Sequence, residues 1–187
     1  MASELADLVV LGEGEEVVGE ITGVVRDWKA SGRTQGSREG VLRELSKVPG
    51  VYVPSMYHVE YDGPAIASIT PKHSDVPARV EKRTIADLSL WPYPKRFITP
   101  LTEVVHDRLS VEVFRGCTRG CRFCQAGIIY RPLRERTHEE VIDAVADLME
   151  NCGYTEFSLV SLSTSDYHDL PGLVRQLHDR FRHRNIT

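Results

Sequence analysis

Cysteine is scarce in this chain, and no apolar run is long enough to cross a membrane. The 187 residues hold four cysteines, and the sequence shows no secretory signal peptide. Disulfide frameworks belong to oxidising compartments, and a membrane-spanning helix needs about 20 consecutive apolar residues. These absences argue against a disulfide-stapled secreted scaffold and against a membrane protein. They predict a cytoplasmic protein with reduced thiols.

An excess of positive charge is also lacking. The formal net charge is -4, and the shares of hydrophobic (41%) and charged (27%) residues are those of a globular domain. A nucleic-acid-binding domain usually carries a basic balance, so the overall charge gives no indication of such binding.

Three of the four cysteines lie in one short stretch, residues 114–127, with the sequence FRGCTRGCRFCQAG. Cys117, Cys121 and Cys124 follow the spacing C-x3-C-x2-C. A structural zinc ion or a fully ligated iron-sulfur cubane needs four protein ligands, and this stretch supplies three. The spacing therefore predicts a metal centre with one open position for a substrate or cofactor.

The same stretch, with Phe123 directly before the last cysteine, resembles the cluster loop of radical S-adenosylmethionine (SAM) enzymes. The resemblance implies that Cys117, Cys121 and Cys124 hold three irons of a 4Fe-4S cluster, that SAM chelates the fourth iron, and that Phe123 lies near the adenine. It further implies reductive cleavage of SAM to methionine and a 5′-deoxyadenosyl radical, which abstracts hydrogen from a substrate that the sequence does not identify. An electron donor such as flavodoxin or ferredoxin would supply the electron, and the protein supplies binding and orientation.

Two other interpretations of the cysteines stay open. One is a zinc-stabilised nucleic-acid-binding module that recruits Cys152 as fourth ligand and uses arginines for phosphates. The other is a non-catalytic iron-sulfur electron-transfer protein, which would also need Cys152. Cys152 follows a predicted helix without a second cysteine beside it, so a small buried residue at the helix end is the simpler expectation.

Arginine is concentrated around the cysteines. Residues 115–136 hold six arginines and a single acid, Glu135. These arginines are Arg115, Arg119, Arg122, Arg131, Arg134 and Arg136. They are expected either to form a solvated loop, or to offset the anionic cluster and the SAM carboxylate or meet a phosphate-bearing substrate.

From Arg108 onward the pattern is strand, loop, helix, strand, helix. Strands are predicted at Leu109–Phe114 and Glu156–Leu162, a helix opens at the T-x-x-E capping box of Thr137, and a second helix opens at Asp169. Two consecutive units of this kind imply neighbouring parallel strands with right-handed crossovers. In barrels of such units the active site lies at the carboxyl ends of the strands, where the cysteine stretch is expected.

A second candidate site follows the second predicted strand, in the sequence SLSTSDY. In radical SAM enzymes the loop at this place contacts the SAM amino group, so the resemblance implies roles for Ser163, Thr164 and Asp166. Asp166 could accept hydrogen bonds from an ammonium. The Gly-Gly-Glu-Pro segment often found there is absent, and ordinary helix capping is the other interpretation.

The start of the chain carries DLVVL at residues 7–11, which predicts a short buried strand, then GEGEE and a helical apolar period that predict a capped helix. Glu13 and Glu15 would repel a phosphate and suit a helix N-terminus. The pattern V-x-GEGE before a helix resembles the end of the Rossmann-like cobalamin-binding-type domain that precedes the barrel in one branch of radical SAM proteins. The stretch VHDRLSVEVFRGCTRGCRFCQAGIIYRPLRER resembles the core of a group of these cobalamin-domain radical SAM proteins. The cobalt-ligating D-x-H-x-x-G motif is absent, which argues against cobalamin binding by this chain.

The sequence thus predicts an α/β chain of three parts. Residues 1–47 would be the C-terminal part of the Rossmann-like domain, and residues 48–107 a connector with a β-hairpin at Tyr57–Thr70 and a proline-rich segment. Residues 108–187 would begin a partial TIM-like radical SAM barrel. A full eight-unit barrel needs roughly 250 residues, so the chain is expected to be a fragment that is inactive by itself.

Overall fold

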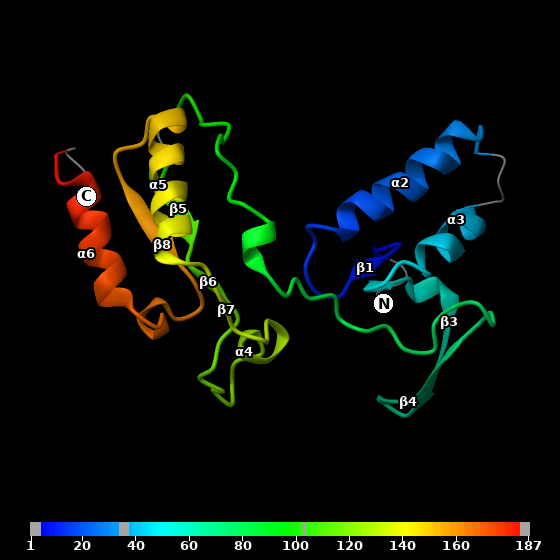
Figure 1. Ribbon diagram of the computed structural model, residues 1–187. Helices are drawn as coiled ribbons and strands as arrows, with labels where there is room; N and C mark the ends of the chain where they lie inside the picture. The colour runs from blue at the N-terminus through cyan, green and yellow to red at the C-terminus, as the bar shows by residue number, and fades with distance from the viewer. Residues whose placement is uncertain (1–4, 34–37, 103, 184–187) are drawn as a thin grey trace. The chain divides into compact units, whose positions relative to one another are not determined.

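The computed structural model describes residues 5–33, 38–102 and 104–183. The chain divides into two compact units, Met1–Ile85 and Ala86–Thr187 (Figure 1). Each unit has its own buried core. Helices and strands occur in both units, which confirms the predicted α/β composition. Within these described ranges no helix is long and apolar enough to cross a membrane.

In the first unit, two helices and a short ribbon surround one apolar core. β1 (Val9–Val10) pairs antiparallel with β2 (Val51–Tyr52), and α2 (Val17–Ala30) and α3 (Arg38–Leu45) contribute their apolar faces. A 3₁₀ turn, η1 (Pro54–Met56), follows β2. The core consists of Val17, Val41, Leu45, Val51, Val53, Met56, Tyr57 and Val76.

The opening strand is shorter and less buried than predicted. Only Val9–Val10 pair in the ribbon, and Val9 and Leu11 are 37% and 36% exposed. The helix start is also not capped by a side chain, because Glu16 stands at the N-cap of α2 without a side-chain cap bond. The Glu13 carboxylate accepts instead from the backbone N–H of Ile85, in a segment whose Arg83 pairs with the glycine turn of GEGEE.

The predicted hairpin is present. β3 (Tyr57–Asp62) pairs antiparallel with β4 (Ala65–Pro71), with an irregularity between Glu60 and Tyr61. Gly63 turns the chain with φ +57°, a conformation that glycine adopts without steric cost, as the Asp62-Gly63 pair predicted.

The second unit is built on two neighbouring parallel strands, as predicted. β5 (Leu109–Glu112) pairs in parallel with β8 (Phe157–Val160) from Leu109↔Phe157 to Glu112↔Val160. α5 (His138–Cys152) connects them and packs on β5, and α6 (Leu170–Phe181) follows β8 (Figure 1). Side chains that are fully buried between these elements include Val111, Val113, Val141, Val145, Leu148 and Leu173.

Both long helices of this unit begin where the sequence predicts. The capping box of α5 is complete, since Thr137 Oγ1 accepts from Glu140 N at 3.2 Å and Glu140 Oε2 accepts from Thr137 N at 2.7 Å. Asp169 caps α6 by accepting from Gly172 N at 3.0 Å. These caps fix the two points at which the chain leaves the loops at the carboxyl ends of the strands.

A second ribbon stands beyond β5. The predicted strand Leu109–Phe114 is divided, because β6 (Phe114–Arg115) pairs antiparallel with β7 (Arg134–Glu135) and not with β8. This ribbon joins the two ends of the loop 116–133, which contains the short helix α4 (Ala126–Ile129). The other short elements are the 3₁₀ turns η2 (Leu88–Leu90) and η3 (Thr164–Asp166).

Candidate metal centre

The loop that carries the cysteines, residues 116–133, starts at a glycine that no other residue can replace without distortion. Gly116 follows β6 with φ +96°, and a Cβ at this position would lie 2.5 Å from the Pro132 carbonyl oxygen. Gly120 has φ +65° in the left-handed region, with only the end of the Arg131 side chain near its missing Cβ. The two glycines let the chain turn between successive cysteines while the base of the loop stays closely packed.

All four cysteines are free thiols. Cys117 and Cys124 are partly buried and Cys121 is exposed. The Cys117 sulfur accepts from the backbone N–H of Arg119 at 3.4 Å, and Cys124 N donates to Cys121 O at 3.0 Å. In the ranges that the structure describes, no three His, Cys, Asp or Glu side chains gather closely enough to hold a metal ion. The loop therefore offers three thiols in one stretch without bringing them into a ligand geometry.

The loop after β8 contacts the cysteine stretch through one ion pair. Arg119 Nε donates to Asp166 Oδ2 at 2.6 Å, and Arg119 Nη2 donates to Asp166 Oδ1. Arg119, with Ser163 as a second donor, holds the pKa of Asp166 below its usual value, and Asp166 raises the pKa of Arg119. The two loops expected at the carboxyl ends of the parallel strands are thus brought together.

The Asp166 carboxylate, predicted to accept hydrogen bonds from an ammonium, accepts them from the Arg119 guanidinium in this structure. Nor does Asp166 cap α6, which Asp169 does. Ser161 Oγ and Thr164 Oγ1 lie 2.9 Å apart and share a hydrogen bond. Ser163 stands at the start of η3, so the predicted hydroxyl groups lie in one turn beside Asp166.

Most side chains of the clustered arginines form hydrogen bonds to other residues of the same unit. Arg115 pairs with Glu112, Arg134 donates to the carbonyl oxygens of Pro132 and Tyr130, and Arg136 donates to those of Leu88 and Trp91. Arg131 donates to Gly127 O at 3.0 Å. Arg134 and Arg136 are 8% and 5% exposed. A solvated loop is therefore the wrong description of the buried Arg134 and Arg136, whereas Arg119, Arg122 and Arg131 are exposed.

Comparison with known proteins agrees with the cysteine spacing. Residues 1–54 match the family described as "Radical SAM proteins, N-terminal", and residues 111–187 match the family "Radical SAM superfamily". The chain belongs to the radical SAM superfamily.

One curated relative supports this membership of an enzyme superfamily. The ribosomal protein uS12 methylthiotransferase RimO of Thermotoga sp. (strain RQ2) is 35% identical over 74 residues, which cover 36% of this chain and 17% of the relative. The matched region of this chain thus corresponds to less than a fifth of the length of that relative. No solved structure matches the chain.

Membership of the radical SAM superfamily implies a 4Fe-4S cluster and SAM, and the donor set suits them. Thiolates are the ligands that iron-sulfur clusters take, and the three cysteines of the loop are neither oxidised to disulfides nor buried beyond reach. Phe123 is 92% exposed, so it is not packed against the loop. The chemistry of the loop fits the cluster, because three free thiols occur within residues 117–124.

The fourth cysteine of this radical SAM chain lies at the other end of the unit. α5 begins at His138 beside β7 and ends at Cys152, roughly 22 Å along the helix. The Cys152 sulfur accepts from Phe97 N at 3.3 Å. Cys152 is therefore not placed to complete a four-cysteine site, which both alternative functions require.

Sequence reasoning missed a polar cluster next to the loop that follows β8. His168 Nδ1 lies 2.6 Å from Glu135 Oε2, and the rings of His168 and His138 stack with centroids 5.7 Å apart. Tyr167 is buried between them and Phe114, and its hydroxyl donates to Arg136 O at 2.6 Å. The sequence has no motif that predicts this cluster, because its members come from three separate segments: β7, α5 and the loop after β8.

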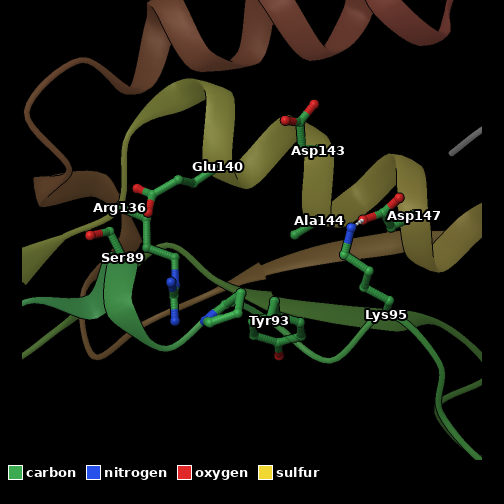
Figure 2. Close-up of a pocket in the computed structure, with 9 residues that line it drawn as sticks. Ser89, Tyr93, Lys95, Arg136, Glu140, Asp143, Ala144 and Asp147 are labelled. Atoms are coloured by element: carbon green, nitrogen blue, oxygen red, sulfur yellow. Dashed lines mark ion pairs between the residues drawn. The ribbon is translucent and has the colours of Figure 1, made fainter.

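A pocket of about 210 Å³ lies along one face of α5 (Figure 2). The Lys95–Asp147 ion pair, at 2.8 Å, lies at one end of it, and Arg136 and Glu140 lie at the other. The remaining lining residues are Ser89, Pro92, Tyr93, Asp143 and Ala144. It contains none of the predicted ligand residues, so it is distinct from the cysteine loop.

Proposed function

We propose that this protein is a radical SAM enzyme in which Cys117, Cys121 and Cys124 hold a 4Fe-4S cluster. When bound, the cluster supplies the electron that splits SAM into methionine and the 5′-deoxyadenosyl radical used for hydrogen abstraction. Flavodoxin or ferredoxin is the class of reductant proposed. The methylthio transfer named for the Thermotoga relative is a property of that protein, and the proposal stops at hydrogen abstraction from a substrate.

The observation that carries the proposal is the meeting of the two loops. The cysteine loop follows the β5–β6 segment, the SAM-side loop follows β8, and the Arg119–Asp166 ion pair connects them. Ligands of α/β proteins with parallel strands bind at this edge. Three free thiols from one loop and a turn rich in hydroxyl groups from its neighbour are the groups that a cluster and its SAM ligand require there.

In this proposal Ser163, Thr164 and Asp166 form the SAM side of the site. Ser163 and Thr164 offer hydroxyls that both donate and accept, and Asp166 offers a carboxylate whose charge is shared with Arg119. Phe123, which is exposed beside Cys124, is the aromatic surface proposed to lie near the adenine.

We further assign residues 1–47 to the end of a Rossmann-like cobalamin-binding-type domain and residues 108–187 to the start of a partial barrel. Residues 48–107 connect the two in sequence, and their first part, residues 48–85, packs with the start of the chain in one compact unit. The match of residues 1–54 to the N-terminal family supports a separate segment at the start. The pair of parallel strands with a helical connection supports the barrel assignment. Cobalamin is not part of the proposed cofactor set.

The test is the metal and acid-labile sulfide content of the anaerobically reconstituted chain, with electron paramagnetic resonance (EPR) spectra of the reduced protein recorded with and without SAM. We expect about four irons and four sulfides, and a spectrum that changes when SAM is added. Cys117→Ser, Cys121→Ser and Cys124→Ser should each lose most of the iron.

Cys152→Ser is the matched control for these three variants. It removes a thiol that contacts Phe97 and should leave both iron content and the SAM-dependent spectral change as in the wild type. One zinc without sulfide, or loss of the metal in Cys152→Ser, would overturn the proposal.

A further inference from the structure

Arg119 lies between two of the cysteines and connects them to the loop after β8. It lies two residues from both Cys117 and Cys121, and its backbone N–H donates to the Cys117 sulfur at 3.4 Å. Its guanidinium donates one hydrogen bond to each carboxylate oxygen of Asp166, which makes a bidentate fork. Among the described residues, this fork is the only hydrogen-bonded link from residues 117–124 to a segment outside the loop 116–133.

The partner of Arg119 is held more firmly than the loop it restrains. The Asp166 side chain is 20% exposed, and its backbone N–H donates to Ser163 O at 2.8 Å within η3. The next residue, Tyr167, is 3% exposed and is anchored to Arg136 O. A planar, bidentate arginine–carboxylate contact fixes direction as well as distance. Asp166 is thus a fixed point on the body of the unit, and Arg119 ties the loop to it.

The same pair also sets the charge beside the thiols. Arg119 brings a cation into the turn between Cys117 and Cys121, and Asp166 brings an anion that neutralises it. The reduction potential of an iron-sulfur cluster depends on nearby net charge, because reduction adds negative charge to the cluster. Removing the cation should therefore lower the potential, and removing the anion should raise it.

We propose that the Arg119–Asp166 ion pair positions the Cys117–Cys121 segment and balances the charge beside the cluster that these cysteines hold. Arg119 and Asp166 are positioning residues, and neither is assigned contact with a reacting atom. The inference rests on the proposed function as far as the cluster is concerned, whereas the restraint on the loop concerns the chain without any cofactor.

The charge-balance part is tested by redox titration of the reconstituted chain, followed by its EPR signal. Arg119→Gln should shift the potential to more negative values, and Asp166→Asn should shift it to more positive values. The double variant should return close to the wild type, and Asp166→Glu, which keeps the charge, should shift it little. A role in folding alone would not give shifts of opposite sign. Shifts in the same direction, or no shift in either single variant, would overturn the inference.

The positioning part is tested on the cofactor-free chain by limited trypsin digestion, measuring the rate of cleavage after Arg122. Losing the ion pair should free the loop, so Asp166→Asn and Arg119→Gln should each be cut about fivefold faster, the factor that ~1 kcal/mol of local stability gives. The matched control is Asp147→Asn, which removes a carboxylate of the same unit that pairs with Lys95 and should be cut at the wild-type rate.

These two measurements separate the possible failures. An unchanged cleavage rate in Asp166→Asn refutes the restraint on the loop whether or not a cluster is present. Faster cleavage together with a wild-type chain that takes up no iron or sulfide keeps the restraint, refutes the proposed function and removes the charge-balance part with it.

Discussion

Tyr167 shows how a single residue connects the candidate site to the body of its unit. Its ring lies parallel to that of Phe114 with centroids 6.5 Å apart, and its hydroxyl donates to Arg136 O. Arg136 in turn donates to the carbonyl oxygens of Leu88 and Trp91. Asp166, directly before Tyr167, therefore sits on a chain of hydrogen bonds that reaches the start of the second unit.

Replacing Tyr167 with phenylalanine should cost about 1 kcal/mol of unfolding free energy, because it removes one buried hydrogen bond. Burial raises the pKa of Tyr167 to about 12, above its ordinary value of 10.0. The folded chain thus holds this proton more tightly than the unfolded chain. The resulting stability is complete below pH 10 and is lost as the pH rises from 10 through 12.

Urea unfolding between pH 7 and pH 12, followed by circular dichroism, checks this prediction. Tyr167→Phe should be less stable than the wild type at neutral pH but should lose less stability above pH 10. Tyr130→Phe, at a tyrosine that is 45% exposed, is the control and should behave like the wild type. An equal alkaline loss in Tyr167→Phe and the wild type would contradict the assignment of this titration.

The arginines show what sequence can and cannot predict about single residues. Cysteine spacing identified the candidate ligands, because chemistry restricts cluster ligands to a few residue types at short separations. The partners of Arg115, Arg134 and Arg136 could not be read from the sequence. Arg136 donates to carbonyl oxygens of Leu88 and Trp91 that only folding brings near, and carbonyls carry no residue-type signal. Glu112 and the partners of Arg134 lie within four residues, but nothing in the sequence selects them. The Arg119–Asp166 pair joins residues 47 positions apart, so it too was invisible.

At the scale of elements, the glycine that opens the cysteine loop matters as much as the thiols. Gly116→Ala would place a methyl group 2.5 Å from a backbone oxygen at a φ of +96°, whereas Gly120→Ala would meet only the flexible end of Arg131 at 3.6 Å. We expect Gly120→Ala to cost about 1–2 kcal/mol, the penalty of a left-handed residue with a Cβ. Gly116→Ala should cost more and should prevent the β6–β7 ribbon from closing.

Thermal unfolding and iron content of the two alanine variants, measured side by side, test this difference. Gly116→Ala should lose both stability and iron, and Gly120→Ala should keep most of its iron. If both variants lost the same amount of stability and iron, the positive φ that the two glycines share, and not the close packing of Gly116 against Pro132, would account for the effect on the loop.

Elements were predictable where local chemistry determines them. The capping box of α5, the Asp169 cap of α6 and the Gly63 turn depend on residues within three positions of one another, and all three are present. The prediction failed for the strand before Glu13, which is short and partly exposed, and for a capped start of α2. There the backbone of Arg83 supplies the hydrogen-bond partner of the turn, and its side chain binds Glu16 and Glu20 at 2.9 and 2.5 Å. A contact across about 70 residues overrides a local preference for capping.

At the scale of the whole molecule, the chain has two separate cores, one in each unit, and both are built from buried apolar side chains. Leu45 belongs to the core of the first unit and Leu148 to that of the second, and they are 3% and 0% exposed. Every predicted cluster ligand and SAM-side residue lies in the second unit. The structure thus groups residues 48–85, predicted as part of a connector, with the start of the chain in one compact unit, because their apolar side chains complete the core beneath α2 and α3.

This arrangement predicts different consequences for the same substitution in the two cores. Leu45→Ala and Leu148→Ala should each cost about 2–5 kcal/mol, the usual cost of truncating a buried leucine. Only Leu148→Ala should reduce the iron retained after reconstitution, because α5 and β5 together support the loop that carries the cysteines. Iron and sulfide content, measured beside unfolding by circular dichroism, distinguishes the two variants. If Leu45→Ala lost as much iron as Leu148→Ala, cluster binding would depend on both units, and the second unit alone would not be sufficient to hold the metal centre.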